Sequence, residues 1–306
     1  MSELTFACPL CRGALSQVHE HLLRCPQDGS EYSSEAGIWH FLRPERRGYF
    51  EQFIAEYELV RREEGRGSEG PAFYRALPFE DLTGKFSGDW KIRARSFMTL
   101  LGKVIIPLEK ASPSLKILDL GAGNGWLSNR LAGRGHSLAA VDLLTNGFDG
   151  LGAYVFYERA FVPVQAEFQF LPFTEGQFDL AIFNASLHYA ENYPTALEEA
   201  LRVLKPDGRV VILDSPVYHD PESGKKMAQE REAYFQTRFG FKSNSIPSQH
   251  YLTFQQLGAL EKQMGLKWET FTPFYGVGWM LKPWRAWVRG RREPAKFLLI
   301  AGQRRQ

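Results

Sequence analysis

The chain has 306 residues, of which 44% are hydrophobic and 24% are charged. This composition supports a sizeable packed core and argues against global disorder, and the length is typical of about two domains. With 37 Lys and Arg against 35 Asp and Glu, the net charge is only +2, so the whole molecule is not an electrostatic binder of nucleic acid, although a local basic patch is not excluded.

The sequence contains no apolar run long enough to span a membrane, and its first residues do not resemble a secretory signal. We therefore expect a cytoplasmic protein without a transmembrane segment. The sequence does not specify an oligomeric state.

All the cysteines lie in the first tenth of the chain and suggest a metal site. The run Cys-Pro-Leu-Cys at residues 8–11 is a tight turn that can direct two thiolates at one ion, and residues 25–28 repeat the spacing with a carboxylate in the last place. A closed site of this kind is structural rather than catalytic. The predicted zinc ligands are Cys8, Cys11, Cys25 and Asp28.

Residues 1–43 resemble the small ribbon proteins that activate tRNA and translation-factor methyltransferases, and the N-terminal ribbon of rRNA guanine methyltransferases, including the closing segment 37–42. Those relatives use four cysteines, so the resemblance implies zinc but leaves Asp28 as a departure. Two alternatives stay open: His19 or His21 takes the fourth place, or the ribbon holds no metal and is stabilised by packing.

Residues 44–111 read as a helical linker. Pro44 begins a predicted helix in which Phe50 and Tyr57 recur at helical spacing, and residues 65–71 form a loop by composition. Such a helix either rests on the main domain or acts as a lid over an acceptor pocket.

A second helix is predicted around Trp90, Phe97 and Val104. It leads into the central domain and carries Arg93 and Arg95. These arginines are either solvated or positioned to meet a ligand carboxylate.

From residue 112 the chain alternates apolar strands with helical segments, which is typical of a parallel sheet covered on both faces. Ligands bind such sheets outside the carboxyl ends of the strands. The predicted strands are Lys116–Leu120, Ser137–Asp142, Val162–Ala166, Phe178–Asn184 and Arg209–Asp214.

The first of these strands runs into a glycine turn that binds nucleotides in other proteins. Gly121, Gly123 and Gly125 are evenly spaced, and Trp126 fills a place that dinucleotide-binding proteins keep small. Asp119 puts a carboxylate near the turn, which disfavours a phosphate and suits an ammonium or sulfonium group. The pattern therefore predicts a positively charged nucleoside rather than a nicotinamide dinucleotide.

These segments, in this order, resemble class I S-adenosylmethionine-dependent methyltransferases up to about Pro216. The resemblance implies a Rossmann-like, seven-stranded methyltransferase sheet with helices on both faces over residues 112–306, in addition to the ribbon. The matching segments are Leu118–Gly125, Asp142, Gln165–Glu167, Leu171–Phe173, Phe178–Asn184 and Leu204–Ile212.

The resemblance also implies how S-adenosylmethionine is bound. Asp119 would face the methionine end, the turn would approach it through its backbone, the acid at the end of the second strand would hold the ribose hydroxyls, and the third strand would hold the adenine. The residues expected at the cofactor are Asp119, Gly121, Ala122, Gly123, Asp142, Leu143, Glu167, Phe168 and Asn184.

The acceptor side is less defined. His188 follows the fourth strand and is either a general base or a pocket wall, and Tyr218 and His219 follow the fifth strand as further catalytic candidates. The chain lacks the Asn-Pro-Pro-Tyr pattern of enzymes that methylate exocyclic or amide nitrogen, so we expect oxygen or carbon as the nucleophile.

The C-terminal region is predicted to hold helices at 222–238 and 253–265 and strands at 266–272 and 297–301, with a basic, tryptophan-rich hairpin at about 273–296. This hairpin could grip RNA or an anionic membrane surface. Alternatively, its tryptophans pack against the body of the protein.

The leading hypothesis is a methyltransferase that acts on a small organic molecule. One alternative is an RNA base methyltransferase that docks through the ribbon and the basic hairpin, and another is a non-catalytic partner protein with a methyltransferase-like fold. The acceptor and the methylated atom do not follow from the sequence.

Overall fold

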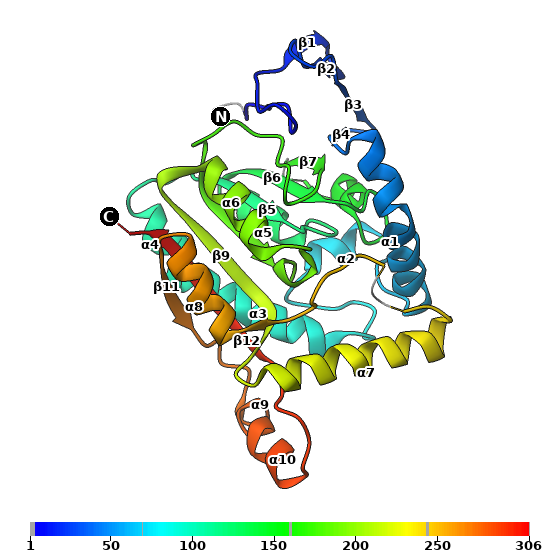
Figure 1. Cartoon of the computed structure of the whole chain (residues 1–306), viewed down its shortest axis with the longest axis vertical. Helices are drawn as coiled ribbons and strands as arrows, with labels where there is room; N and C mark the ends of the chain where they lie inside the picture. Colours follow the sequence, from blue (N-terminus) through cyan, green and yellow to red (C-terminus); the bar gives the residue numbers. More distant parts are fainter. Residues whose placement is uncertain (1–3, 69, 159–160, 243–244, 306) are drawn as a thin grey trace.

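Figure 1 shows the chain as a computed structural model, which describes residues 4–68, 70–158, 161–242 and 245–305. The strands form a single sheet. They are β1 (Ser16–His19), β2 (Leu22–Arg24), β3 (Glu31–Glu35), β4 (Ile38–His40), β5 (Lys116–Leu120), β6 (Ser137–Asp142), β7 (Val162–Gln165), β8 (Phe178–Asn184), β9 (Leu204–Tyr218), β10 (Leu252–Thr253), β11 (Leu266–Phe271) and β12 (Lys296–Arg304).

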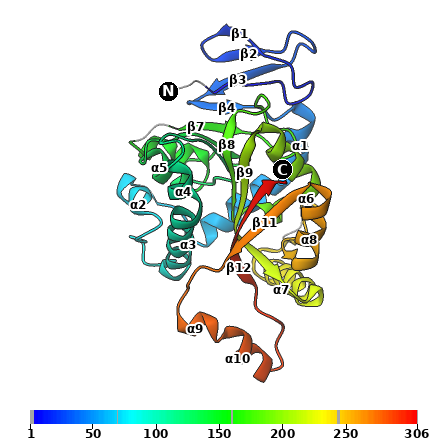
Figure 2. The same cartoon turned by 90° about the vertical axis from the view of Figure 1, so that its left-hand side faces the viewer.

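Helices cover both faces of this sheet (Figure 2). The α-helices are α1 (Pro44–Glu63), α2 (Pro71–Ala76), α3 (Ser87–Leu100), α4 (Ile106–Glu109), α5 (Trp126–Ala132), α6 (Tyr193–Val203), α7 (Pro221–Phe239), α8 (Phe254–Gln263), α9 (Val277–Met280) and α10 (Lys282–Val288). A π-helical turn, η1 (Leu101–Ile105), and two 3₁₀ turns, η2 (Leu151–Phe156) and η3 (Leu187–Tyr189), complete the secondary structure of the described ranges.

The strand order around the centre is β7-β6-β5-β8-β9-β12-β11. The first five of these strands are parallel, and β12 runs antiparallel to both β9 and β11. This arrangement confirms the predicted α/β sheet and its antiparallel edge. It also places the carboxyl ends of β5, β6, β7 and β8 at one side of the sheet.

The core lies on both faces of the central strands because their side chains alternate. Leu118 and Leu120 of β5 belong to a cluster with residues of α6 and α8, whereas Ile117 belongs to a second cluster with residues of α3 and α5. Buried parallel strands of this kind read as continuous apolar runs. The short run at residues 116–120 was therefore sufficient to predict β5.

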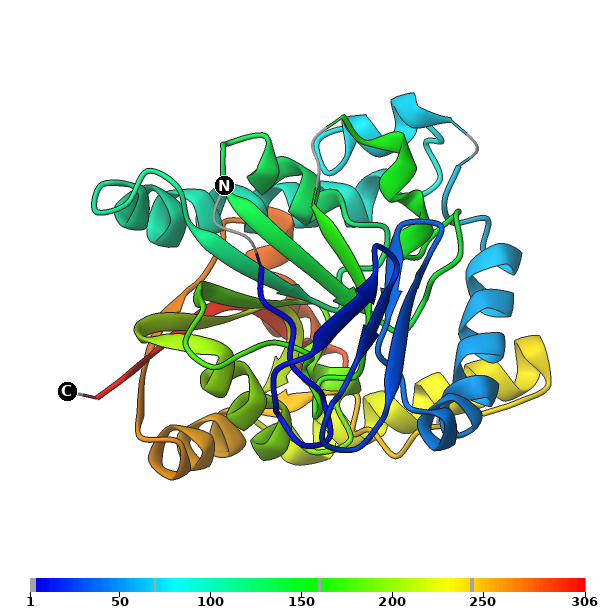
Figure 3. The same cartoon turned by 90° about the horizontal axis from the view of Figure 1, so that it is seen from above.

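The N-terminal ribbon extends the same sheet. Its last strand, β4, pairs in parallel with β7, and Trp39 stands opposite Val164. The ring of Phe6 contacts the rings of Trp39, Phe41 and Phe173 at centroid distances of 5.5, 4.9 and 5.6 Å. Figure 3 shows the ribbon strands over this edge of the sheet.

Helix α1 connects the ribbon to the body. Its Pro44 occupies the first turn, and Phe50 and Val60 are buried. Phe50 packs in a small cluster with Leu42 and Ile246. Figures 1 and 3 both show α1 beside the long helix α7, at the side of the sheet where the strands end.

One predicted strand extends further in the structure. Strand β9 continues to Tyr218, four residues beyond the predicted end, because β10 pairs with Val217–Tyr218 and β12 pairs with Pro216–Val217. The predicted insertion at about 273–296 connects the antiparallel strands β11 and β12 and contains the two short helices α9 and α10. No helix in the described part of the chain is long and apolar enough to cross a membrane.

Candidate active site

A cavity of about 1160 Å³, part of it open to solvent, lies at the carboxyl ends of β5 to β8. It is lined by the turn after β5, the ends of β6 and β8, the segment after β7, and the inner face of α1. Trp126 also lines it but does not close it, since its ring packs sideways against Trp90 and Phe97 at centroid distances of 6.1 and 5.9 Å.

The three glycines of the turn have separate roles. All have positive φ angles. A Cβ on Gly121 would lie 2.2 Å from the Cβ of Ser186, and one on Gly125 would lie 2.6 Å from the ring of Phe161, so these two positions exclude a side chain for packing reasons. Gly123 is different, because a Cβ there would meet only the Asp149 carbonyl oxygen at 3.6 Å. Its backbone faces the cavity.

Asp142 is tied to this turn. Its Oδ2 accepts a hydrogen bond from the Gly123 N–H at 2.7 Å, and its Oδ1 accepts one from the Leu144 N–H at 2.9 Å. The carboxylate lines the cavity beside Leu143. Each oxygen keeps a lone pair for a ligand, and burial raises the pKa of Asp142 although the backbone donors oppose this.

Glu167 lines the same cavity, as do Phe168, Ala122 and Asn184. Its carboxylate is held by α1: Arg46 Nη2 donates to Oε2 at 2.6 Å, and Arg46 also reaches Glu191 at 3.1 Å. Burial raises the pKa of Glu167, and Arg46 opposes that shift. Glu167, which was expected to contact the adenine, therefore forms an ion pair with a side chain of α1.

Asp119 does not face the cavity, contrary to expectation. It is fully buried, and its Oδ2 accepts a hydrogen bond from Ser128 of α5 at 2.8 Å. Since Leu118 and Leu120 point to the opposite face of β5, Asp119 must point toward the helix. Its Oδ1 has no hydrogen-bond partner among the described residues, and burial raises the pKa of Asp119 to about 7.

Aromatic and basic side chains also line the cavity. They are Tyr57 and Arg61 of α1, Arg93 of α3 and Tyr189 of η3. Arg61 forms an ion pair with Asp149. Arg93 lies over the Trp90 ring at 5.3 Å and has no ion-pair partner within the described ranges.

Tyr189, rather than His188, lines the cavity. The 3₁₀ turn η3 directs His188 inward, where its Nδ1 lies 3.2 Å from the Ser215 hydroxyl. Burial lowers the pKa of His188 well below its ordinary value. Burial opposes ionisation of Tyr189, but Arg231 and Arg61 lower its pKa below the ordinary value.

Tyr218 and His219 also lie outside the cavity, because the continuation of β9 carries them away from the strand ends. Tyr218 is buried near Arg292. The His219 ring stacks on Phe254 at 4.0 Å, and its Nε2 lies 2.7 Å from Lys296 Nζ. None of the three predicted catalytic residues is among the described residues that line the cavity.

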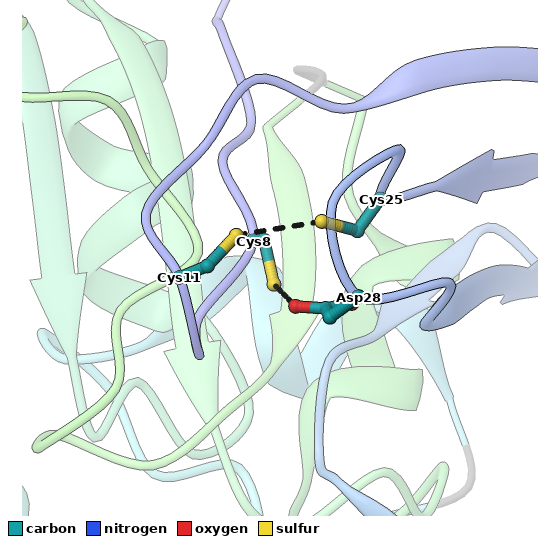
Figure 4. A group of neighbouring side chains, drawn as sticks. All are labelled: Cys8, Cys11, Cys25 and Asp28. Carbon is teal, nitrogen blue, oxygen red and sulfur yellow. Dashed lines mark hydrogen bonds between the residues drawn. The ribbon is translucent and has the colours of Figure 1, made fainter.

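The predicted metal ligands lie together in the ribbon (Figure 4). The ligand atoms of Cys8, Cys11, Cys25 and Asp28 all lie within 4.8 Å of one another. Cys8 Sγ is 3.1 Å from Asp28 Oδ2, and Cys11 Sγ is 3.4 Å from Cys25 Sγ. The second distance is too long for a disulfide bond, and the three cysteines are free.

Part of the chain is similar to known proteins. Residues 118–212 match the family model of a methyltransferase domain. The YcgJ protein of Bacillus subtilis has a similar fold, with a TM-score of 0.50 and 16% identity over 70% of this chain and 99% of that chain. The central sheet therefore has a methyltransferase fold.

The methyltransferase segment is also similar to curated proteins. An uncharacterized protein of Mycobacterium tuberculosis is 27% identical over 41% of this chain and 46% of its own length. A malonyl-[acyl-carrier protein] O-methyltransferase of Erwinia pyrifoliae is 34% identical over 34% of this chain and 39% of its own length. The chain thus spans less than half of the length of these two relatives.

No sequence motif marked the side chains that α1 contributes. Arg46, Tyr57 and Arg61 lie outside residues 118–212, which match the family model. Phe50 and Tyr57 are separated by two helical turns and therefore share a face. That periodicity predicted a buried face, with a lid over a pocket as one of two alternatives, but it did not identify Arg46 or Arg61.

The raised pKa of Asp119 predicts a pH effect on stability. Its folded-state pKa of about 7 exceeds the ordinary value, so between about pH 4 and 7 the folded chain holds a proton that the unfolded chain has lost. Stability from this group therefore falls as pH rises through that window. We expect Asp119→Asn to remove the effect, with a gain at pH 8 relative to pH 5 of about 3 kcal/mol in the free energy of urea unfolding.

The matched control for this experiment is Asp207→Asn, at an exposed position. It should change the free energy of unfolding equally at both pH values. An unchanged pH dependence in Asp119→Asn would contradict the assignment.

The contacts of Arg46 predict that α1 depends on this side chain. Arg46→Gln would leave Glu167 buried without its cation, and we expect a loss of about 2–3 kcal/mol in urea unfolding together with faster amide exchange in α1. Arg62→Gln on the same helix is the control. Arg62 is exposed, and its ion pair with Glu58 is long, with 4.0 Å between Nη2 and Oε2. This variant should lose less than about 1 kcal/mol in the free energy of unfolding. Equal losses in the two variants would refute the role of Arg46.

Proposed function

We propose that this protein is an S-adenosylmethionine-dependent methyltransferase that acts on a small organic acceptor, with oxygen or carbon as the nucleophile. The observation that supports it is one cavity lined both by the glycine turn with Asp142 and by the aromatic pair Tyr57 and Tyr189. We place the cofactor beside the glycine turn and the acceptor beside the two tyrosines. Such an arrangement brings a cofactor and an acceptor together, and positioning is a large part of the catalysis of a group transfer.

The residues around the glycine turn fit the cofactor. The Gly123 backbone is open to the cavity, and the Asp142 oxygens can each accept a further hydrogen bond, as two adjacent ribose hydroxyls require. Asn184 Oδ1 is buried without a hydrogen-bond partner among the described residues. Leu143 and Phe168 offer apolar walls to a base.

When bound, S-adenosylmethionine supplies a methyl group that its sulfonium already activates for transfer. Asp142 would hold the ribose, and Arg93 would meet the methionine carboxylate, because it is a cation at the cavity without an ion pair in the described structure. Burial lowers the pKa of Arg93, which Asp214 partly offsets. The ion pairs of Arg46 would hold α1 over the site and exclude water.

Tyr189 replaces His188 as the residue proposed to act on the acceptor. It lines the cavity, and its OH is 3.4 Å from Arg231 Nη2. The lowered pKa of this phenol suits a group that accepts a proton from a hydroxyl or an acidic C–H. Tyr57, opposite it, has its ring centroid 6.2 Å from that of Tyr189.

A small acceptor is favoured over RNA by the cover that α1 provides. Phe50, Phe53, Tyr57 and Arg61 of this helix all line the cavity, so a base in a folded RNA would have to displace the helix. The relatives named above include an O-methyltransferase of a malonyl-[acyl-carrier protein], which is consistent with an oxygen nucleophile.

We also propose that the ribbon binds one structural zinc ion. Four ligands at about 2.0–2.3 Å from a tetrahedral zinc lie about 3.3–3.8 Å from one another. The Cys8–Asp28 and Cys11–Cys25 ligand atoms are 3.1 and 3.4 Å apart, and all four lie within 4.8 Å of one another. Thiolates with one carboxylate are an acceptable zinc donor set. All four positions are filled by side chains, so the site has no open place for chemistry.

The cofactor assignment predicts binding of S-adenosylhomocysteine and not of NAD. Calorimetry should detect the former, and Asp142→Asn should weaken it by about tenfold to a hundredfold, since hydrogen bonds to a charged group are lost. Tyr189→Phe is the control: it should leave this affinity close to that of the wild type but lower the rate of methyl transfer. Binding of NAD alone, or unchanged affinity in Asp142→Asn, would refute the proposal.

The acceptor class can be tested with S-adenosylmethionine carrying a labelled methyl group. We expect label in the small-molecule fraction of a cell extract and none in the RNA fraction. Label in RNA would support the alternative acceptor, and label in neither fraction with intact S-adenosylhomocysteine binding would refute the small-molecule assignment.

The zinc proposal predicts about one zinc ion per chain by elemental analysis of the purified protein. Cys25→Ser should lose the metal and lower the melting temperature, whereas Asp28→Cys should keep it and release it more slowly to a chelator, because a thiolate is the softer ligand. Glu31→Gln, an exposed acid nearby, is the control. Absence of zinc from the wild type would mean that packing alone holds the ribbon.

A further inference from the structure

The segment 274–291, which we name the tryptophan projection, leaves the body between β11 and β12 and contains α9 and α10. Figures 1 and 2 show it extending away from the rest of the molecule. It carries an unusual share of the apolar surface: seven of the seventeen large hydrophobic side chains exposed in the described structure lie between Phe274 and Val288.

We propose that the tryptophan projection docks this protein on the surface of an anionic lipid bilayer. This interaction goes beyond methyl transfer and does not depend on it. It rests on three observations: the apolar side chains at the tip, the basic side chains among them, and the polar contacts that fix the base.

The apolar side chains are aliphatic as well as aromatic. Trp284 and Trp287 are 61% and 78% exposed, and Val277 and Met280 are each 66% exposed. Exposed groups of this size concentrated on one segment mark an interaction site. Of the three tryptophans in the projection, Trp279 packs against the body, as the alternative prediction had it. Its ring centroid lies 5.1 Å from that of Tyr275 and 5.7 Å from that of Phe297.

The charge of the projection is uniformly positive. Residues 274–291 contain Lys282, Arg285, Arg289 and Arg291 and no acidic residue. None of these four cations forms an ion pair with a described residue; Lys282 lies over the Trp279 ring at 3.3 Å. Basic residues near a membrane surface are attracted by anionic headgroups, and tryptophan prefers the headgroup depth.

Hydrogen bonds hold both ends of the projection to the body, so its exposed side chains have a defined position. The Tyr275 hydroxyl lies 2.8 Å from Ser96 Oγ and 3.3 Å from Asp214 Oδ1. At the other end, Glu293 Oε2 accepts hydrogen bonds from the backbone N–H groups of His219 and Asp220 at 2.9 and 3.0 Å.

Other partners fit these features less well. RNA bases stack on tryptophan but gain little from Val277, Met280 and Val288. A second copy of the projection would bring four cations against four cations, which is repulsive. A bilayer can bind both kinds of side chain, since its apolar interior accommodates the aliphatic groups and its phosphates form ion pairs with the arginines.

The experiment is flotation of the full chain with vesicles of phosphatidylcholine alone and of equal parts phosphatidylcholine and phosphatidylglycerol. We expect binding to the anionic vesicles only, weaker at high salt. Trp284→Ala/Trp287→Ala and Arg285→Glu/Arg289→Glu should each weaken binding by about tenfold or more.

Matched controls lie elsewhere on the surface. Met98→Ala/Val155→Ala removes two exposed apolar side chains, and Lys262→Glu/Lys267→Glu reverses two exposed charges; both should bind vesicles as the wild type does. Circular dichroism melts confirm that each variant is folded. In the wild type, brominated lipid should quench tryptophan fluorescence, and the double tryptophan variant should lose that quenching.

Several outcomes would overturn the proposal. These are no flotation with anionic vesicles, equal binding of the projection variants and their controls, or projection variants that lose RNA affinity or self-association, measured by gel shift and sedimentation, while vesicle binding is absent. Because flotation needs no cofactor, failure here leaves the methyltransferase assignment untouched, and failure of S-adenosylhomocysteine binding leaves this proposal untouched.

Discussion

The hydrogen bond from the Gly123 N–H to the Asp142 carboxylate joins the ends of two neighbouring strands, β5 and β6. It depends on a backbone that enters positive φ at Gly121 and Gly123 and on an acid that ends its strand at the same level. The rest of the site is arranged around this contact. The pairing of β5 with β6 fixes the register of the two strands, and α1 covers the cavity at their carboxyl ends.

That closure relies on charge as much as on apolar packing. Arg46 and Arg61 bring two guanidinium groups onto Glu167 and Asp149, while Phe50 and Tyr57 line the space between them. A buried carboxylate needs a cation or hydrogen-bond donors to stay ionised, so the acids at the strand ends and the arginines of α1 depend on one another. The covering helix is thus chemically part of the site, although it lies outside the segment that resembles known methyltransferases.

Much of this architecture could be predicted from the sequence because local signals agreed with the fold. The strands β5, β6 and β8 were predicted with their observed bounds, since buried parallel strands are short apolar runs flanked by turns. Asp142 and the glycine turn followed from spacing. Side-chain direction could not be predicted in the same way. Whether Asp119 faces a ligand or a helix depends on which face of the sheet its side chain lies on, and the sequence of one strand does not say which face that is.

The acceptor side shows the same limit. His188 and Tyr189 are neighbours in the sequence, and a 3₁₀ turn decides which of them points into the cavity. Tyr218 and His219 were misplaced because tertiary pairing with β10 and β12 lengthened β9 beyond its apolar run. The arginines of α1 come from a distant part of the chain and carry no motif.

The pairing of β4 with β7 gives the ribbon a protective role toward the sheet. In its absence β7 would be an outermost strand with unpaired backbone groups, and proteins with such bare strands tend to associate edge to edge. A chain shortened to begin at residue 44 would expose these groups. The small N-terminal module therefore shields the larger one from aggregation, whatever else it binds.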